Sequence, residues 1–215
     1  HIIQEYHKNE MKTTMHLSTG GVGNLGQIPI SVGVISAMPE APVLSSYRSH
    51  AAFLAKTKNF NPVGHFWNEM YGLSPGRQGS MHLCLPKKGH FLSSAVVGTQ
   101  IPVALGMAYA RGPTICFFGD GATECGVFWE SMNLASLWNL PVLFVLEDNG
   151  LAMDSPKKAR HAFNLCDIGA LFHMKQVEVD GHDVEVVYQA TLDIREKLPT
   201  LMICKTTRYP KHVGI

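Results

Sequence analysis

Two short apolar runs, separated by an amphipathic stretch, define the middle of the chain. Residues 114–118 (TICFF) and 142–146 (VLFVL) are apolar apart from one threonine, a pattern typical of strands buried on both faces. Between them, residues 125–140 carry apolar side chains spaced three or four apart, which indicates one apolar face of a helix. These side chains are Phe128, Met132, Ala135 and Trp138. The pattern predicts a strand–helix–strand unit.

The lengths of the three elements predict where this unit ends. The helix spans roughly 24 Å, against about 20 Å for a six-residue strand. The chain therefore runs out along one strand, returns along the helix and runs out again. A right-handed crossover then places Asp120 and Asn149, which follow the two strands, side by side at the carboxyl edge of a parallel sheet. Open α/β sheets bind their ligands at this edge.

The rest of the chain continues the alternation of strands and helices. Residues 59–89 are rich in Gly and Pro and predict a long loop around a short helix at 66–71, and residues 151–164 are irregular. The other expected elements are helices at 32–38, 97–111, 167–172 and 184–197, and strands at 43–47, 176–179 and 200–205. This order indicates the α/β class, with a parallel sheet flanked by helices. We expect residues 1–215 to form a single domain, truncated at one or both ends.

Composition and charge exclude several classes of partner. The chain is 46% hydrophobic but only 16% charged, against about 25% charged in an average protein. A surface this poor in charge favours oligomerisation. The formal net charge of +1 gives no electrostatic basis for binding nucleic acid or an anionic membrane. No apolar run approaches the roughly 18 residues that a membrane span needs.

The cysteines are scattered, odd in number and lack any Cys-x-x-Cys spacing. This pattern indicates small core residues in a reducing compartment, and argues against disulfides and zinc ligands. They are Cys84, Cys116, Cys125, Cys166 and Cys204.

The Gly119-Asp120-Gly121 turn and Asn149 provide the chemistry of the predicted edge. Mg²⁺ prefers six oxygen ligands at about 2.1 Å and shares its shell with phosphates and water. One carboxylate and one amide oxygen suit that preference. The glycines let the backbone approach a phosphate, and the start of the next helix favours an anion. A lone Gly-Asp-Gly more often marks a turn whose Asp caps a helix, but an Asn at the matching strand end favours a metal–diphosphate site.

Several sequence blocks occur in the order that one enzyme family shows. The blocks are SYRSH at 46–50, GSMHL at 79–83, VGTQIP at 97–102, GDG at 119–121 with Asn149, and TRYPKH at 207–212. From about His16 onward, the chain resembles the alpha subunit of the thiamine-diphosphate-dependent first component of 2-oxo acid dehydrogenase complexes, of the pyruvate, branched-chain or acetoin type. The resemblance implies the thiamine-diphosphate-binding fold, with thiamine diphosphate and Mg²⁺ as cofactors.

The resemblance also implies roles for individual residues at the metal and diphosphate. Asp120 and Asn149 ligate the metal through their side chains, and Leu151 ligates it through its backbone carbonyl. Gly121 and Ala122 offer backbone N–H groups to the diphosphate.

Other residues surround the rest of the implied cofactor. Arg48 is the cationic partner of the diphosphate, since a guanidinium matches phosphate oxygens, and Tyr47 lines the site. Ala95 and Val97 contact the aminopyrimidine and thiazolium rings. His212 is the active-site loop histidine, suited to proton transfer near neutral pH. The alternatives are a surface ion pair for Arg48 and core packing for Val97.

Three positions depart from the pattern of the relatives. Asp148 and Leu151 stand where relatives often carry Asn and Tyr. A backbone ligand tolerates any side chain, so the change at 151 is mild. Val213 follows His212 where mitochondrial members often carry a regulatory Ser, which implies that this phosphorylation switch is absent.

The implied activity is decarboxylation of a 2-oxo acid, or cleavage of acetoin, with transfer of the product to a lipoyl-bearing acyltransferase component. A beta subunit supplies the glutamate that activates the cofactor, so the implied assembly is a heterotetramer and the alpha chain alone is inactive. The alternatives are a non-catalytic binding relative and a transketolase-like half enzyme. The expected location is the bacterial cytoplasm, with the mitochondrial matrix as the alternative. The choice of substrate stays open.

Overall fold

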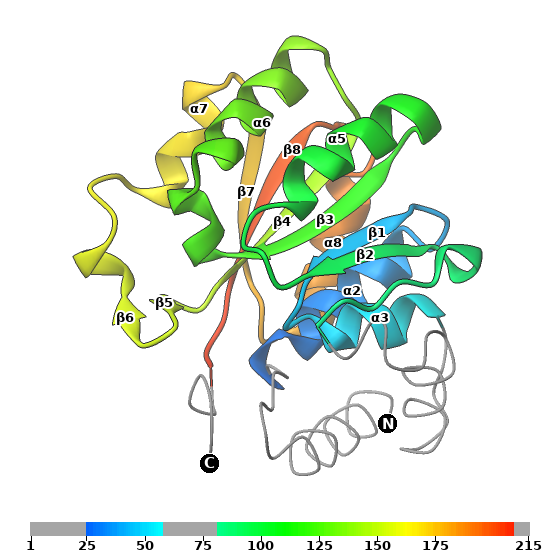
Figure 1. The fold of residues 1–215 in the computed structure, drawn as a ribbon, viewed down its shortest axis with the longest axis horizontal. Helices are drawn as coiled ribbons and strands as arrows, with labels where there is room; N and C mark the ends of the chain where they lie inside the picture. Colours follow the sequence, from blue (N-terminus) through cyan, green and yellow to red (C-terminus); the bar gives the residue numbers. More distant parts are fainter. Residues whose placement is uncertain (1–24, 58–80, 209–215) are drawn as a thin grey trace.

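A parallel sheet forms the centre of the computed structural model, which describes residues 25–57 and 81–208 (Figure 1). Its strand order is β2-β1-β3-β4-β8-β7. These strands are β1 (Val43–Ser46), β2 (His90–Ser94), β3 (Thr114–Gly119), β4 (Val142–Asp148), β7 (Lys175–Asp180) and β8 (Thr200–Lys205). A separate antiparallel pair consists of β5 (Leu151–Ala152) and β6 (Ser155–Pro156).

Helices cover both faces of the sheet (Figure 1). One face carries α5 (Gln100–Arg111), α6 (Gly126–Leu137) and α7 (Ile168–Leu171). The other face carries α2 (Ile28–Ala37), α3 (His50–Thr57) and α8 (Val184–Ile194). Short 3-10 turns are η1 (Leu25–Gln27), η2 (Pro86–Lys88), η3 (Asp120–Glu124), η4 (Lys157–Ala159) and η5 (Leu165–Asp167). The α/β class predicted from the sequence is confirmed.

The apolar side chains of β3 pack on both faces of the sheet. Cys116 and Phe118 pack into the core beneath α5 and α6, whereas Ile115 and Phe117 pack into the core beneath α2 and α8. All four side chains are fully buried. This two-residue alternation explains why the run is continuously apolar, since a strand covered on both faces has no solvent-facing side.

Close packing of α2 against α8 closes the second face. A Cβ added at Gly33 would lie 2.8 Å from Val187 Cγ1, so only glycine lets the two helices approach this closely. Asp183 begins α8 by accepting hydrogen bonds from the backbone N–H of Glu185 at 2.9 Å and of Val186 at 3.3 Å, which caps the first turn.

The structure places most predicted elements within a few residues, with two omissions. Both α3 and β2 were missed, because no element was expected between the strand at 43–47 and the loop region at 59–89, or between that region and the helix at 97–111. The short helix predicted at 66–71 lies outside the described residues. Trp138 was wrongly placed on the buried face of α6: it follows the last residue of the helix and is 59% exposed. Within the described residues, no helix has the length and apolar character to cross a membrane.

The prediction that all cysteines are core residues is wrong in part. Cys116 and Cys204 are buried strand residues, and burial raises the pKa of both thiols. Cys84 and Cys125 are only half-buried, and Cys166 is exposed. All five thiols are free.

His90 in β2 is a buried polar group whose protonation is linked to folding. Its Nε2 lies 3.1 Å from Ser45 Oγ, and its ring packs edge-on against Phe53. Burial, and secondarily the charge of Lys56, lowers the pKa of His90 from 6.5 to about 3. The folded protein therefore keeps this ring neutral, whereas the unfolded chain binds a proton below about pH 6.5.

We expect this linkage to make the protein less stable as the pH falls from about 6.5 towards 3. One proton taken up only by the unfolded chain lowers the free energy of unfolding by up to about 1.4 kcal/mol per pH unit. Urea unfolding at pH 7, 6 and 5 measures this slope in the wild type and in His90→Asn, which is expected to lose that contribution. His173→Asn, at an exposed histidine, is the control. Equal slopes for wild type and His90→Asn would contradict the linkage.

Candidate functional site

A cavity of about 370 Å³ opens at the carboxyl edge of the sheet. Residues that follow β1, β2, β3, β4 and β8 form its wall, so segments far apart in sequence meet there. Most residues predicted for the site line it: Tyr47, Arg48, Val97, Asp120, Gly121, Ala122, Asn149 and Leu151. The carboxyl edge of a parallel sheet is where open α/β folds bind ligands.

Asp120 directly follows β3 and lines this cavity. Gly119 pairs with Glu147 of β4 in parallel register, which brings the end of β3 level with the end of β4. Asp120 is only 1% exposed, and its Oδ2 lies 2.5 Å from Nη2 of Arg160. Neither η3 nor α6 has a side-chain cap, so Asp120 is not a helix-capping residue in the described structure.

The local structure between β3 and α6 differs in detail from the prediction. The chain forms η3, a 3-10 turn of five residues, before α6 begins at Gly126. The N-terminus of the long helix therefore does not follow the Gly-Asp-Gly turn directly.

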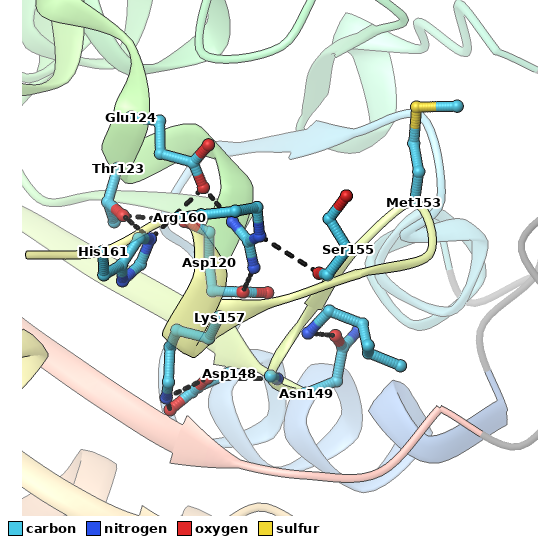
Figure 2. Close-up of polar contacts among 12 residues, drawn as sticks. Asp120, Thr123, Glu124, Asp148, Asn149, Met153, Ser155, Lys157, Arg160 and His161 are labelled. Atoms are coloured by element: carbon cyan, nitrogen blue, oxygen red, sulfur yellow. Dashed lines mark hydrogen bonds and ion pairs between the residues drawn. The ribbon is translucent and has the colours of Figure 1, made fainter.

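Asn149 follows β4 and is held in a tight turn. Its side-chain Oδ1 accepts a hydrogen bond from the backbone N–H of Leu151 at 2.9 Å (Figure 2). Gly150 between them has φ of +74°, a conformation that glycine adopts without steric cost. The turn fixes the amide oxygen of Asn149 beside the start of β5, where Leu151 also lines the cavity.

Gly121 allows the wall of the cavity to close. A Cβ added there would lie 2.9 Å from Cβ of Ala152 in β5, a distance that real side chains do not tolerate. The lack of a side chain therefore lets the turn after β3 pack against the segment after β4.

The residues that follow β1 and β2 also line the cavity. Nε of Arg48 donates to the hydroxyl of Tyr47 at 3.3 Å, and its guanidinium carbon lies 5.2 Å from the centre of that ring. Val97 is 52% exposed and lines the cavity, which argues against a core-packing role. Ala95 is half-buried and is not among the described residues that line the cavity. His212 lies outside the described residues.

Sequence reasoning missed a group of charged residues around Asp120. Arg160 contacts Asp120 through Nη2 and Glu124 through Nη1, and its Nε donates to the backbone carbonyl of Ser155 at 3.1 Å (Figure 2). His161 Nε2 lies 3.2 Å from Oε1 of Glu124. Burial, and then the charge of Arg160, lowers the pKa of His161. Arg160 lies in the segment predicted as irregular, where no periodic pattern indicates which side chains turn inward.

Asp148 anchors the segment that carries Arg160. Its carboxylate lies 2.6 Å from Nζ of Lys157 and 2.9 Å from Nζ of Lys205. Burial opposes ionisation of Asp148, but the hydrogen bonds and charges of the two lysines outweigh burial and lower its pKa. The residue that departs from the family pattern thus ties the end of β4 to β8 and to η4.

The donor set of the cavity fits a metal-bound diphosphate in chemical type. Asp120, Asn149 and Leu151 offer a carboxylate, an amide and a backbone carbonyl, which are the hard oxygens that Mg²⁺ prefers. Two other lining residues, Gln27 and Gln100, are buried and have side-chain oxygens without a hydrogen-bond partner in the described structure. A polar ligand with N–H donors would satisfy these oxygens.

Comparison with known proteins decides the family. Residues 6–214 match the family described as Dehydrogenase E1 component. The chain belongs to this family. The family resemblance predicted from the sequence motifs is therefore confirmed.

Two curated relatives of this E1 component chain are named as alpha subunits. The chain is 33% identical to the alpha subunit of acetoin:2,6-dichlorophenolindophenol oxidoreductase from Bacillus subtilis, over 87% of this chain and 60% of the relative. It is 34% identical to the pyruvate dehydrogenase E1 component subunit alpha of Zymomonas mobilis, over 87% of this chain and 57% of the relative. The chain thus spans about three-fifths of the length of these relatives.

A solved structure supports the fold of the E1 component chain. A transketolase from Pichia stipitis superposes with a TM-score of 0.75 at 18% identity, over 96% of this chain and 36% of that one. At this level of identity, the likeness concerns the fold alone. It confirms that the sheet and its helices have the arrangement predicted from the resemblance.

Proposed function

We propose that this chain is the cofactor-binding alpha subunit of a dehydrogenase E1 component that uses thiamine diphosphate and Mg²⁺. Its substrate is a 2-oxo acid or acetoin, and the product passes to a lipoyl-bearing acyltransferase component. One observation carries the proposal: Asp120 and Asn149, at the ends of adjacent parallel strands, line one cavity with Arg48 and Val97 in a chain of this family. The names of the relatives favour this function over a non-catalytic binding subunit.

Within this proposal, the residues of the chain hold and orient the cofactor. Asp120, Asn149 and the carbonyl of Leu151 hold the cation. The backbone N–H groups of Gly121 and Ala122, which have no side chain and a small one, bind the diphosphate from the turn after β3.

The residues that follow β1 and β2 complete the binding of the cofactor. The guanidinium of Arg48 adds a cationic partner for the diphosphate, and Tyr47 packs beside it. Val97 presents an exposed branched side chain to the cavity, which suits a wedge against the rings of the cofactor. Ala95 lies two residues before Val97, after the end of β2, and His212 moves a proton near the substrate.

The catalytic power is divided between the cofactor, this chain and a partner. Thiamine diphosphate supplies, when bound, the nucleophilic carbon and the electron sink for cleavage next to the oxo group. The two acids that line the cavity among the described residues, Asp120 and Glu124, both pair with Arg160. As the family resemblance implies, we assign the activating glutamate to a beta subunit in a heterotetramer. The free thiols are compatible with a reducing compartment such as the bacterial cytoplasm.

Calorimetric titration with thiamine diphosphate tests the proposal. The titration is run with and without Mg²⁺, and with and without a beta subunit encoded beside this chain. We expect binding that requires Mg²⁺, and decarboxylation of pyruvate or a branched-chain 2-oxo acid, or cleavage of acetoin, only when both subunits are present. Activity of the alpha chain alone, or binding that does not respond to Mg²⁺ in the presence of the partner, would overturn the proposal.

A further inference from the structure

Arg160 pairs with Asp120, the carboxylate proposed to bind the divalent cation. Its guanidinium bridges two acids, with Nη2 at 2.5 Å from Oδ2 of Asp120 and Nη1 in contact with Oε1 of Glu124 (Figure 2). The Arg160 side chain is only 10% exposed, and that of Asp120 is 2% exposed. Arg160 also lines the cavity, together with both acids.

A buried carboxylate needs a positive partner, and the structure supplies it from the protein. An ionised carboxylate removed from water is strongly unfavourable unless it is paired and hydrogen-bonded. Arg160 provides both the charge and a directed N–H donor to Asp120. A divalent cation would meet the same requirement at the same oxygen. The two cations repel each other at contact distance, so a divalent cation that binds Oδ2 of Asp120 weakens the pairing of this oxygen with Arg160.

The segment that carries Arg160 is weakly attached to the rest of the fold. It consists of the two-residue strands β5 and β6 followed by η4, and most of its side chains are exposed. Apart from the Arg160 contacts, it is anchored mainly by polar groups: Lys157 N donates to Gly150 O at 2.7 Å, Lys157 pairs with Asp148, and Arg208 contacts Asp154 and the carbonyl of Met153. Segments with few buried apolar contacts open locally at low free-energy cost.

We propose that Arg160 is a latch that competes with the divalent cation for Asp120. While it pairs with Asp120, the guanidinium holds residues 153–160 against the cavity wall, and a cation bound at Asp120 displaces it. The inference rests on the proposed function, because it takes Asp120 as a metal ligand. It adds that this chain sets its own metal affinity through a residue of the segment after β4.

Removing the guanidinium is expected to tighten metal binding. In Arg160→Gln, we expect the Kd for Mg²⁺, measured by calorimetry or by the thermal shift that Mg²⁺ produces, to fall by about tenfold or more. Lys158→Gln is the matched control, because it removes one positive charge from an exposed side chain of the same segment that does not line the cavity. We expect it to leave the Kd within about twofold, since exposed charges interact weakly.

The outcomes separate the latch from the proposed function. Equal Mg²⁺ affinity in wild type and Arg160→Gln would overturn the latch and leave the metal site intact. Weaker binding in Arg160→Gln would also overturn it, because Arg160 would then support the site. Absence of Mg²⁺ binding in both proteins would overturn the latch together with the metal part of the proposed function.

Proteolysis of the wild-type protein provides a test that does not depend on the folding of a variant. Trypsin cleaves after Lys157, Lys158 and Arg160, which all lie in the segment. If Mg²⁺ releases the latch, cleavage at these positions, followed by mass spectrometry, becomes several-fold faster at saturating Mg²⁺, whereas cleavage after Arg111 of α5 does not. An unchanged or slower rate within the segment would overturn the proposal.

Discussion

Asp120→Asn is expected to weaken the Mg²⁺-dependent binding of thiamine diphosphate by more than about 100-fold. Loss of an outer-shell partner of a metal already costs about 10–100-fold in affinity, and this change removes the charge of a direct ligand. Asn has nearly the same shape as Asp, so the change tests charge and not packing. Calorimetric titration with the cofactor at fixed Mg²⁺, in the presence of the beta subunit, measures the effect.

Asp193→Asn provides the control for this experiment. Asp193 is exposed on α8, which covers the face of the sheet away from α5 and α6, and it does not line the cavity. Its replacement changes the net charge equally and is expected to leave binding unchanged. Wild-type affinity in Asp120→Asn would remove Asp120 from the metal site and, with it, the main support for the proposed function.

Phe118→Ala is expected to destabilise the protein by about 3–5 kcal/mol. Phe118 precedes the Gly-Asp-Gly turn, is fully buried, and packs against Phe128 and Phe144 with ring centres 5.7 and 6.5 Å apart. Truncation removes apolar burial and leaves a cavity between β3, β4 and α6. The expected loss is a large fraction of the roughly 5–15 kcal/mol that stabilises a typical domain.

Urea unfolding at neutral pH measures this loss, with Trp138→Ala as the control. Trp138 is also aromatic and lies beside the same face, but it is 59% exposed. Its truncation is expected to cost less than about 1 kcal/mol. A similar loss of unfolding free energy in both variants would show that the burial of Phe118 does not determine its contribution to the stability of the protein.

Hydrophobic periodicity predicted the helices that have one clear apolar face and the strands that are buried on both faces. The strand predicted at 200–205 is β8, and residues 114–118 form most of β3. In contrast, β2 was missed because its buried side chains are largely polar. His90 and Ser93 both hydrogen-bond to Ser45 of the neighbouring strand, at 3.1 and 2.9 Å. A pattern of apolar residues does not detect a strand whose buried side is satisfied by hydrogen bonds.

The candidate site shows the same division between what a pattern predicts and what tertiary structure determines. Asp120 and Asn149 come together because strand register and a right-handed crossover fix the ends of adjacent strands. Arg160 and Glu124 were not predicted, since their meeting depends on the path of the short β5–β6 hairpin. That path follows from Asn149 and Gly150, whose turn redirects the chain after β4. The structure brings most of the predicted site residues to one cavity, but the roles of all of them, Ala95 and His212 included, stay predictions.

The segments that line the cavity follow different strands, and this affects how the binding site can change during evolution. Each wall segment joins the sheet through its own strand, and the strands are fixed by the two buried layers beneath them. An insertion or exchange after β1 or β2 therefore reshapes one side of the binding space without disturbing the register of β3 and β4. Selectivity can therefore change on one side of the cavity while the turns after β3 and β4, proposed to hold the cation and the diphosphate, stay under separate constraint.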